Sequence, residues 1–333
     1  MQVTVLGAGS WGTALALQLC RAGSEVRLWD HKSERAMRMN QARENKKYMP
    51  GIAFPDNLTV GSDLRWAISD SILVVSAIPS QGMRAVMSRA LPHLKPEVPI
   101  CCASKGIEQG TLMTMEETLR DVLPVVHHAQ LSFLAGPSFA KEVAQDLPTA
   151  VVIASRFSDM AKSVARTFHA GNFRVYHTDD IVGAELGGAL KNVIAIACGV
   201  ADGLGVGLNC RAAIMTRGLA EITRLAVARG ANPLTLAGLA GMGDLTLTCT
   251  GNLSRNRRVG LGLGQGKSLR LILEELGQVA EGVVTAKSSM ELAHREGIEM
   301  PISQKIYEVL YENKSARLAM QQLLAREQRA ERG

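Results

Sequence analysis

The sequence has few of the features that mark metalloproteins, disulfide-stapled proteins and nucleic-acid binders. Aromatic residues make up 4% of the 333 residues, and no nucleic-acid-binding motif accompanies the modest net charge of +6. The six cysteines form no CxxC pair, and the seven histidines show no metal-binding spacing with Cys, Asp or Glu. We therefore expect no metal and no nucleic-acid partner. Free thiols in mostly apolar segments are typical of a reducing cytoplasm.

A secretion signal and a membrane span are also missing from the pattern. Residues 1–7 read as a strand, with no basic start followed by an apolar signal core. The apolar run 186–201 has 16 residues and contains a lysine, whereas a span needs about 20 apolar residues. We expect a cytoplasmic protein without a membrane span, and the chain is long enough for two domains.

A glycine-rich turn near the N-terminus carries the strongest motif. In order along the chain come a strand pattern, the turn, a helical pattern, a second strand and an acid: 2–6, 7–12, 13–23, 25–29 and Asp30. A lone GxGxxG is weak evidence, but between a strand and a helix it indicates a dinucleotide site. Gly7 permits the tight turn, Gly9 lets the backbone approach the pyrophosphate, and Gly12 allows close packing. The diphosphate then rests on the helix N-terminus.

Strand patterns recur in the first half and then stop. Further strands are predicted at 71–79, 98–104, 128–136 and 149–155. Their alternation with helical segments predicts a Rossmann-type, doubly wound and mostly parallel sheet over residues 1–181. Ligands bind beyond the carboxyl ends of such strands, and the unpatterned segment 43–57 is expected to be a long loop near the site.

Only helical patterns follow, so we expect an all-α domain over residues 182–333. The helices are predicted at 182–201, 210–229, 254–263, 268–276, 282–296, 302–311 and 315–325.

Lys191 is the leading candidate for a catalytic acid/base. It stands with Asn192 in an almost wholly apolar helix, and burial lowers the pKa of a lysine. The alternative is a lysine that reaches the helix end or pairs with Glu185 or Asp202.

Two more clusters of candidate site residues lie before a predicted helix and at its start. Residues 240–251 read as a glycine-spaced loop that carries Asp244 and Thr248, with helix capping as the alternative role of Asp244. Ser254 is predicted to cap the next helix, where an arginine beside free N–H groups would suit a phosphate. For Arg257 and Arg258 we favour a solvated face.

The order of these motifs resembles one enzyme family. The segments GAGSWGTALA, SKGIE, LAGPSFAKEVA, LKNVIAIACGVADGLG, GDLTLTCTGNLSRNRRVG and VAEGVVTAK are similar to successive motifs of bacterial NAD(P)-dependent glycerol-3-phosphate dehydrogenase. The resemblance runs from residue 3 to about 325. It implies reversible reduction of dihydroxyacetone phosphate to sn-glycerol 3-phosphate for glycerophospholipid synthesis, with NAD or NADP, in a cytoplasmic homodimer.

The resemblance also implies residue roles. Lys191 would give a proton to the forming alkoxide and act as the base in the reverse direction. Asn192, Asp244 and Thr248 would orient it, and Lys105 would contact substrate and cofactor. The other implied substrate contacts are Gly136, Ser138, Ser254, Arg255 and Asn256, the last two on the phosphate. The other implied cofactor contacts are Gly7, Gly9, Ser10, Trp11, Gly12, Asp30, His31, Ala140, Arg255, Val279 and Glu281.

One residue departs from the pattern of NADPH-preferring relatives, which often carry a small neutral residue at Asp30. A carboxylate there suits the ribose 2′-hydroxyl of NAD and repels a 2′-phosphate, while His31 and Lys32 act in the opposite direction.

Three other readings remain open at this point. One is a dehydrogenase of the 6-phosphogluconate dehydrogenase type, which also combines such a sheet with a helical domain and a catalytic lysine. Another is a non-catalytic nucleotide sensor, which would not need Lys191, Asp244 and Arg255 together. A basic nucleic-acid binder is the weakest of the three.

Overall fold

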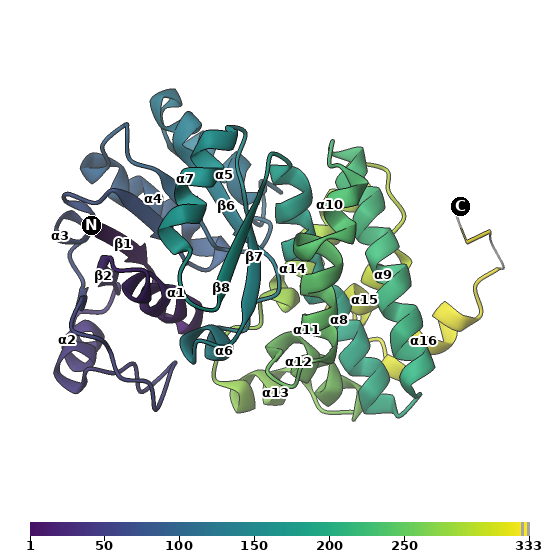
Figure 1. Ribbon diagram of the computed structural model, residues 1–333. Coiled ribbons are helices and arrows are strands. Elements are labelled where there is room, and N and C mark those ends of the chain that lie inside the picture. Colours follow the sequence, from purple (N-terminus) through teal and green to yellow (C-terminus); the bar gives the residue numbers. More distant parts are fainter. Residues whose placement is uncertain (328–329, 332–333) are drawn as a thin grey trace.

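The computed structural model describes all residues except 328–329 and 332–333. Figure 1 shows the sheet with its covering helices on the left and a bundle of helices on the right. The strands β1–β8 form one eight-stranded sheet in the order β3-β2-β1-β4-β5-β6-β7-β8. Their bounds are Gln2–Leu6, Glu25–Trp29, Leu58–Gly61, Leu73–Ser76, Ile100–Cys102, Leu131–Ala135, Thr149–Ala154 and Phe173–Thr178.

The sheet is mostly parallel and doubly wound, as predicted. Neighbours from β3 to β6 pair in parallel, β7 runs antiparallel to β6, and β8 runs parallel to β7. Successive side chains of a strand point to opposite faces, so Val3 and Val5 of β1 join one apolar core and Leu6 joins the other.

Helices cover both faces of this sheet. The helices of the N-terminal part are α1 (Ser10–Arg21), α2 (Ser33–Ala42), α3 (Leu64–Ile68), α4 (Met83–Ala90), α5 (Met115–Val122), α6 (Ala140–Ala144) and α7 (Ser158–Phe168), with short 3-10 turns η1 (Ser80–Gly82), η2 (Leu91–His93) and η3 (Val125–Gln130). Helices α1, α6 and α7 pack on the Val3 face, and α3, α4 and α5 pack on the Leu6 face.

The described residues after 180 form helices and turns, which confirms the all-helical second part. These are α8 (Ile181–Leu204), α9 (Leu208–Ala228), α10 (Pro233–Ala237), the π-turn η4 (Leu239–Gly243), α11 (Asp244–Thr250), α12 (Arg255–Gly264), α13 (Leu269–Leu276), α14 (Glu281–Arg295), α15 (Pro301–Tyr311) and α16 (Ala316–Leu324).

Helix α8 is the centre of the helical core. It has 24 residues, with a window of mean hydropathy 1.5 that is 89% buried inside the protein. The helix is therefore longer than the apolar run 186–201 indicates, and its length and composition would allow it to cross a membrane. Its burial by α9, α11, α12 and α14 identifies it as a core helix.

Glycines let α12 lie directly against α8. A Cβ on Gly199 would stand 2.0 Å from the carbonyl oxygen of Arg257, and one on Gly260 would stand 1.9 Å from that of Ile196. Only backbone without a side chain fits at such contacts. This close approach places the start of α12 beside the middle of α8, where Lys191 and Asn192 lie.

Several local predictions need correction. Strands β3 and β8 were missed, because neither contains a buried apolar run. Residues 240–251 are not a loop: the segment forms η4 and then α11, whose first residue is Asp244. The free cysteines were predicted correctly, since all six are free and five of them are buried.

Candidate active site

The glycine turn after β1 has the geometry that a dinucleotide needs. Gly7 has a φ of +109°, and a Cβ on Gly12 would stand 1.8 Å from the Gly7 carbonyl oxygen. A Cβ on Gly9, in contrast, would meet no atom of the described chain within 4 Å. Gly9 also precedes α1 without a side-chain cap. An open backbone in front of unpaired helix N–H groups fits a pyrophosphate.

Side chains around this turn connect it to neighbouring segments. Ser10 Oγ donates to the carbonyl of Tyr48 at 3.1 Å, which holds the loop 43–57 against the turn. Trp11 Nε1 donates to the carbonyl of Ala103 at 3.1 Å, at the end of β5. Ala140 is the first residue of α6, which packs against α1. The loop 43–57 is thus irregular and beside the turn, as predicted.

Asp30 follows β2 and is enclosed by protein donors. Its side chain has no exposed surface, and Arg35 binds both carboxylate oxygens, at 2.6 and 2.7 Å. The backbone N–H of Lys32 donates to Oδ1 at 2.8 Å. His31 is 58% exposed, with Nδ1 at 3.8 Å from the same oxygen. Sequence analysis did not predict the Arg35 pair.

The second part of the site is a buried cluster around Asp244. Lys191 Nζ donates to Asp244 Oδ1 and, at 2.8 Å, to Thr248 Oγ1. Lys105 Nζ donates to Asp244 Oδ2 at 2.7 Å and to the carbonyl of Gly136 at 3.3 Å. One carboxylate thus holds two lysines that come from the two halves of the fold. The alternative partners of Lys191, Glu185 and Asp202, bind elsewhere.

The electrostatics of this cluster prepare Lys191 for proton exchange. Burial lowers the pKa of Lys191 to about 8, with Asp244 acting to raise it and the positive charge of Lys105 acting to lower it further. A group whose pKa lies near the working pH can both donate and accept a proton. Lys191 therefore has the electrostatic setting of a general acid and base.

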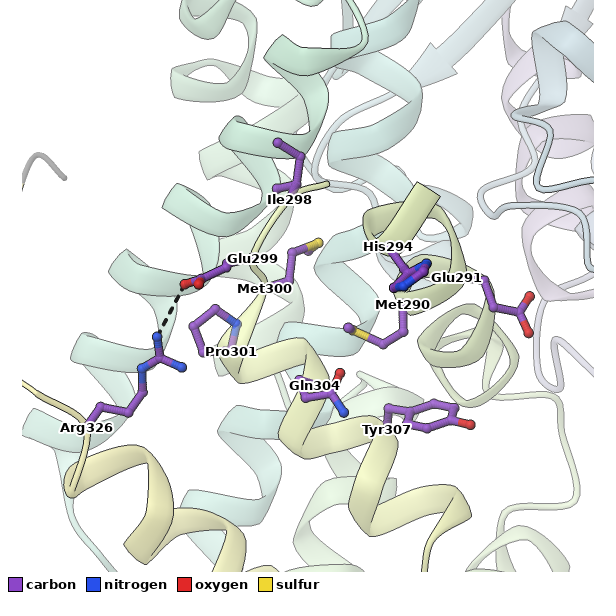
Figure 2. Close-up of a pocket in the computed structure, with 10 residues that line it drawn as sticks. All are labelled: Met290, Glu291, His294, Ile298, Glu299, Met300, Pro301, Gln304, Tyr307 and Arg326. Atoms are coloured by element: carbon purple, nitrogen blue, oxygen red, sulfur yellow. Dashed lines mark hydrogen bonds and ion pairs between the residues drawn. The ribbon is translucent and has the colours of Figure 1, made fainter. Parts of the chain in front are cut away.

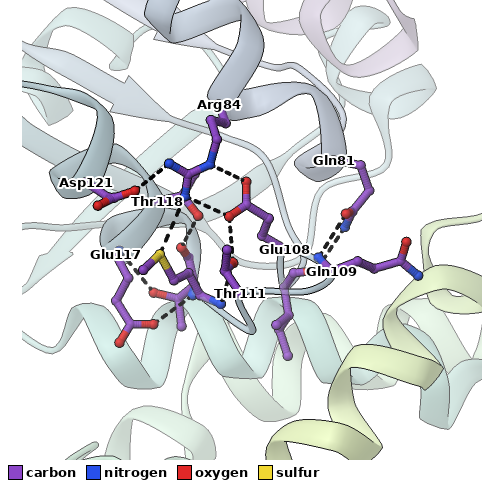
Figure 3. A network of polar contacts seen from close by, with 11 residues as sticks. Gln81, Arg84, Glu108, Gln109, Thr111, Glu117, Thr118 and Asp121 are labelled. Carbon is purple, nitrogen blue, oxygen red and sulfur yellow. Dashed lines mark hydrogen bonds and ion pairs between the residues drawn. The ribbon is translucent and has the colours of Figure 1, made fainter.

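A polar network fixes the loop that carries Lys105. Figure 3 shows Arg84 bound to both carboxylate oxygens of Glu108, at 3.0 and 2.9 Å, with Thr111 donating to the same carboxylate. Gln81 donates to the carbonyl of Ile107 at 2.9 Å and accepts from the N–H of Gln109. The backbone on the C-terminal side of Lys105 is therefore anchored to η1 and α4.

The start of α12 contributes another set of polar groups. Ser254 caps the helix as predicted, since its Oγ accepts from the N–H of Arg257 at 3.2 Å. Asn256 Nδ2 donates to Asn192 Oδ1 at 2.8 Å, and Asn256 Oδ1 accepts from the N–H of Gly282. Arg255 is exposed and donates to the carbonyl of Val279 at 2.7 Å. Ser138, after β6, donates to the Gly136 carbonyl.

Glu281, the first residue of α14, faces the same region. Burial raises the pKa of its carboxyl, while the positive charges of Arg255, Lys105 and Lys191 act to lower it. Of the predicted contacts, Val279 thus binds Arg255, and Glu281 lies within the electrostatic influence of Arg255 and both lysines.

Arg257 differs from the sequence prediction of a solvated face. Its side chain is 14% exposed and pairs with Asp202 of α8, at 2.8 Å from Nε. Arg258 is exposed, as predicted. Arg257 is mostly buried because α12 lies close to α8, and no local sequence pattern reveals that contact.

A groove of the described chain lies away from these groups. Figure 2 shows it between α14, α15 and the Glu299–Arg326 ion pair, with a volume of about 630 Å³. None of the predicted site residues lines it. No group of three or more His, Cys, Asp or Glu within the described residues could hold a metal ion.

The fold and the site together define a dinucleotide-dependent dehydrogenase with a buried lysine. Two family models match the chain, the NAD-dependent glycerol-3-phosphate dehydrogenase N-terminus over residues 2–161 and the corresponding C-terminus over residues 180–321. The chain belongs to the NAD-dependent glycerol-3-phosphate dehydrogenase family.

Individual relatives agree with this family. The chain is 53% identical to glycerol-3-phosphate dehydrogenase [NAD(P)+] of Anaeromyxobacter dehalogenans, covering 99% of this chain and 100% of that protein. The corresponding protein of Geobacter metallireducens is 52% identical, with 100% and 99% covered. The crystal structure of glycerol-3-phosphate dehydrogenase from Coxiella burnetii superposes with a TM-score of 0.93 at 40% identity, covering 98% of this chain and 99% of that one.

Proposed function

We propose that the chain catalyses the reversible, NAD(P)-dependent reduction of dihydroxyacetone phosphate to sn-glycerol 3-phosphate, the glycerol backbone for phospholipid synthesis. Membership of the family supports this reaction over the 6-phosphogluconate dehydrogenase type and over a non-catalytic sensor. The observation that carries the mechanism is the Lys191–Asp244–Lys105 cluster beyond the carboxyl ends of the sheet strands.

The residues of the cluster have separable tasks in this reaction. A reduced nicotinamide cofactor, held by the glycine turn after β1, would supply the hydride for the C2 carbonyl carbon when bound. The carbonyl electron pair then moves onto oxygen, and Lys191 Nζ donates a proton to that oxygen and becomes a neutral amine. Asp244 and Thr248 hold Nζ in place through the contacts described above. In the oxidation, neutral Lys191 takes the hydroxyl proton.

Charged groups outside the cluster would bind the phosphate. We assign Arg255 and Asn256 to the substrate phosphate, with Ser254 beside them at the start of α12. The exposed Arg255 guanidinium and the helix N-terminus both favour an anion. Lys105, Gly136, Ser138 and Asn192 would contact the rest of the substrate.

The proposed cofactor site extends from the glycine turn after β1 to the lysine cluster. We assign the pyrophosphate to Gly7, Gly9, Ser10, Trp11 and Gly12, and the nicotinamide end to Lys105, Ala140, Arg255, Val279 and Glu281. Residues 1–181 would then supply most of the cofactor contacts. Residues 182–333, of which 328–329 and 332–333 lie outside the described part, would supply the substrate site. We further propose a cytoplasmic homodimer, which sedimentation analysis would test.

A spectrophotometric assay tests the function directly. Dihydroxyacetone phosphate should be reduced with both NADH and NADPH, measured in parallel. In the reverse direction glycerol 3-phosphate should be oxidised and 3-hydroxy acids should not. Preference for a 3-hydroxy acid would refute the proposed substrate.

A further inference from the structure

The most informative polar contact outside the Asp244 cluster is the pair between Asp30 and Arg35. Asp30 ends β2, the position at which sheets of this class meet the adenosine ribose. Its carboxylate is completely buried and accepts three hydrogen bonds, two from Arg35 and one from the N–H of Lys32. The protein therefore balances the charge of this carboxylate and supplies the hydrogen-bond donors that it needs.

Arg35 is held in one orientation by these contacts. The guanidinium uses Nε and Nη2 to bind Asp30, and its Cζ lies over the ring of Tyr48 at 5.4 Å from the centroid. The described chain offers Nη1 no acceptor. A guanidinium has five N–H donors in a fixed fork. Arg35 can therefore bind Asp30 along one edge and an anion along another.

The surroundings of this pair are positively charged. Between residues 30 and 48 the sequence has six Lys or Arg and three Asp or Glu. Lys32 is exposed beside Asp30. The Lys47 ammonium lies 5.2 Å from the centroid of the Tyr48 ring, the ring over which Arg35 also lies. A phosphate near the end of β2 would meet a net positive potential once Asp30 is neutralised.

We propose that Arg35 sets the cofactor preference of this chain, by neutralising Asp30 and offering its free edge to the 2′-phosphate of NADPH. An acid at the end of β2 is commonly associated with NAD, because it accepts a hydrogen bond from the ribose 2′-hydroxyl. Here the acid serves as an anchor for an arginine, so NADPH binds more tightly than NADH. This inference rests on the proposed cofactor site and deepens it.

Binding of adenosine nucleotides, measured by titration calorimetry without substrate, tests the proposal. The probes are adenosine 2′,5′-bisphosphate (2′,5′-ADP) and 5′-AMP, which differ only in the 2′-phosphate. The wild type should bind 2′,5′-ADP more tightly. Arg35→Leu should weaken binding of 2′,5′-ADP by roughly 10–100-fold, the value of a charge-assisted contact, and change binding of 5′-AMP by about twofold or less.

Two further variants separate a specific contact from general charge. Arg38→Leu removes an arginine from the same helix that is 74% exposed and pairs with Glu34 at 3.9 Å, so it should leave the ratio of the two affinities unchanged. Asp30→Asn removes the negative charge but keeps an acceptor oxygen for Arg35, so it should keep or raise the preference for 2′,5′-ADP. This variant keeps the proposal testable if Arg35→Leu fails to fold.

The outcomes are distinct. A wild type that binds 5′-AMP as tightly as 2′,5′-ADP would overturn the proposal, as would an equal loss of both ligands in Arg35→Leu or an equal effect of Arg38→Leu. A shift of Asp30→Asn toward 5′-AMP would also overturn it. Failure to reduce dihydroxyacetone phosphate with either cofactor would instead refute the proposed function, because the binding test involves no turnover.

Discussion

Replacing Asp244 by Asn should shift the pH dependence of the reaction, because its carboxylate holds two ammonium groups. In the wild type its two oxygens accept from Lys191 and Lys105, and the side chain is 1% exposed. The variant keeps the shape of the side chain but removes the negative charge. Lys191 then shares a buried space with the positive charge of Lys105, and both burial and Lys105 lower its pKa.

The size of the shift follows from the charges. An opposite charge within hydrogen-bond distance changes a pKa by about one to three, so the pKa of Lys191 should fall from about 8 to about 5–7. At pH 7.5 most Lys191 carries its proton in the wild type, whereas in Asp244→Asn the protonated fraction should drop by roughly threefold for a pKa of about 7 and more than a hundredfold for a pKa of about 5. Reduction at this pH should slow, and the rise of oxidation with pH should begin at lower pH.

The assay is kcat/KM for reduction and for oxidation from pH 5.5 to 9.5, since this ratio reports groups of the free enzyme. Thr248→Val is the matched control, because it removes a hydrogen bond to Lys191 Nζ without removing charge. Its profile should keep an inflection near pH 8. An Asp244→Asn profile that also keeps an inflection near 8 would show that Asp244 does not control the pKa of Lys191.

Two other changes test the substrate and the packing. Arg255→Ala should raise KM for dihydroxyacetone phosphate with little loss of stability, since a charge-assisted contact contributes about 1.5–3 kcal/mol. Inorganic phosphate should compete with substrate in the wild type and much less in the variant. Equal inhibition of both proteins would place the phosphate site elsewhere. Gly260→Ala should lower the free energy of unfolding by about 1–3 kcal/mol or more, because its Cβ would stand 1.9 Å from the Ile196 carbonyl. Chemical denaturation measures this, with exposed Gly266→Ala, at φ +83° with no neighbour of the described chain within 4 Å of its Cβ, as a comparison for backbone strain alone. An unchanged midpoint for Gly260→Ala would contradict the close packing of α12 on α8.

The predictable parts of the fold are those with a local signal. The buried strands β1 and β2 have the bounds expected from their apolar runs. Strand β8 was missed because most of its side chains are solvent-accessible. Helix α11 was missed because the glycines before it suggest a loop, whereas Gly241 serves a close backbone contact with Leu236.

Some features of the site could likewise be predicted from local sequence patterns, whereas others depend on tertiary contacts. The apolar setting of Lys191 marked it as a proton-transfer candidate, and its burial and lowered pKa agree with that. Its partner Asp244 is 53 residues away, and the bond from Lys105 to Asp244 spans 139 residues. Those contacts depend on how the two parts of the fold meet. The Asp30–Arg35 pair spans five residues and had a local signal, an arginine in the first turn of the helix that follows the acid.

The most direct test of the account is turnover by Lys191→Ala with dihydroxyacetone phosphate, measured together with the dissociation constant for the cofactor. If Lys191 donates the proton, kcat should fall by roughly 10²–10⁴-fold, the usual contribution of a positioned acid, while cofactor affinity is retained. Near-normal turnover in a variant that still binds the cofactor would contradict the account.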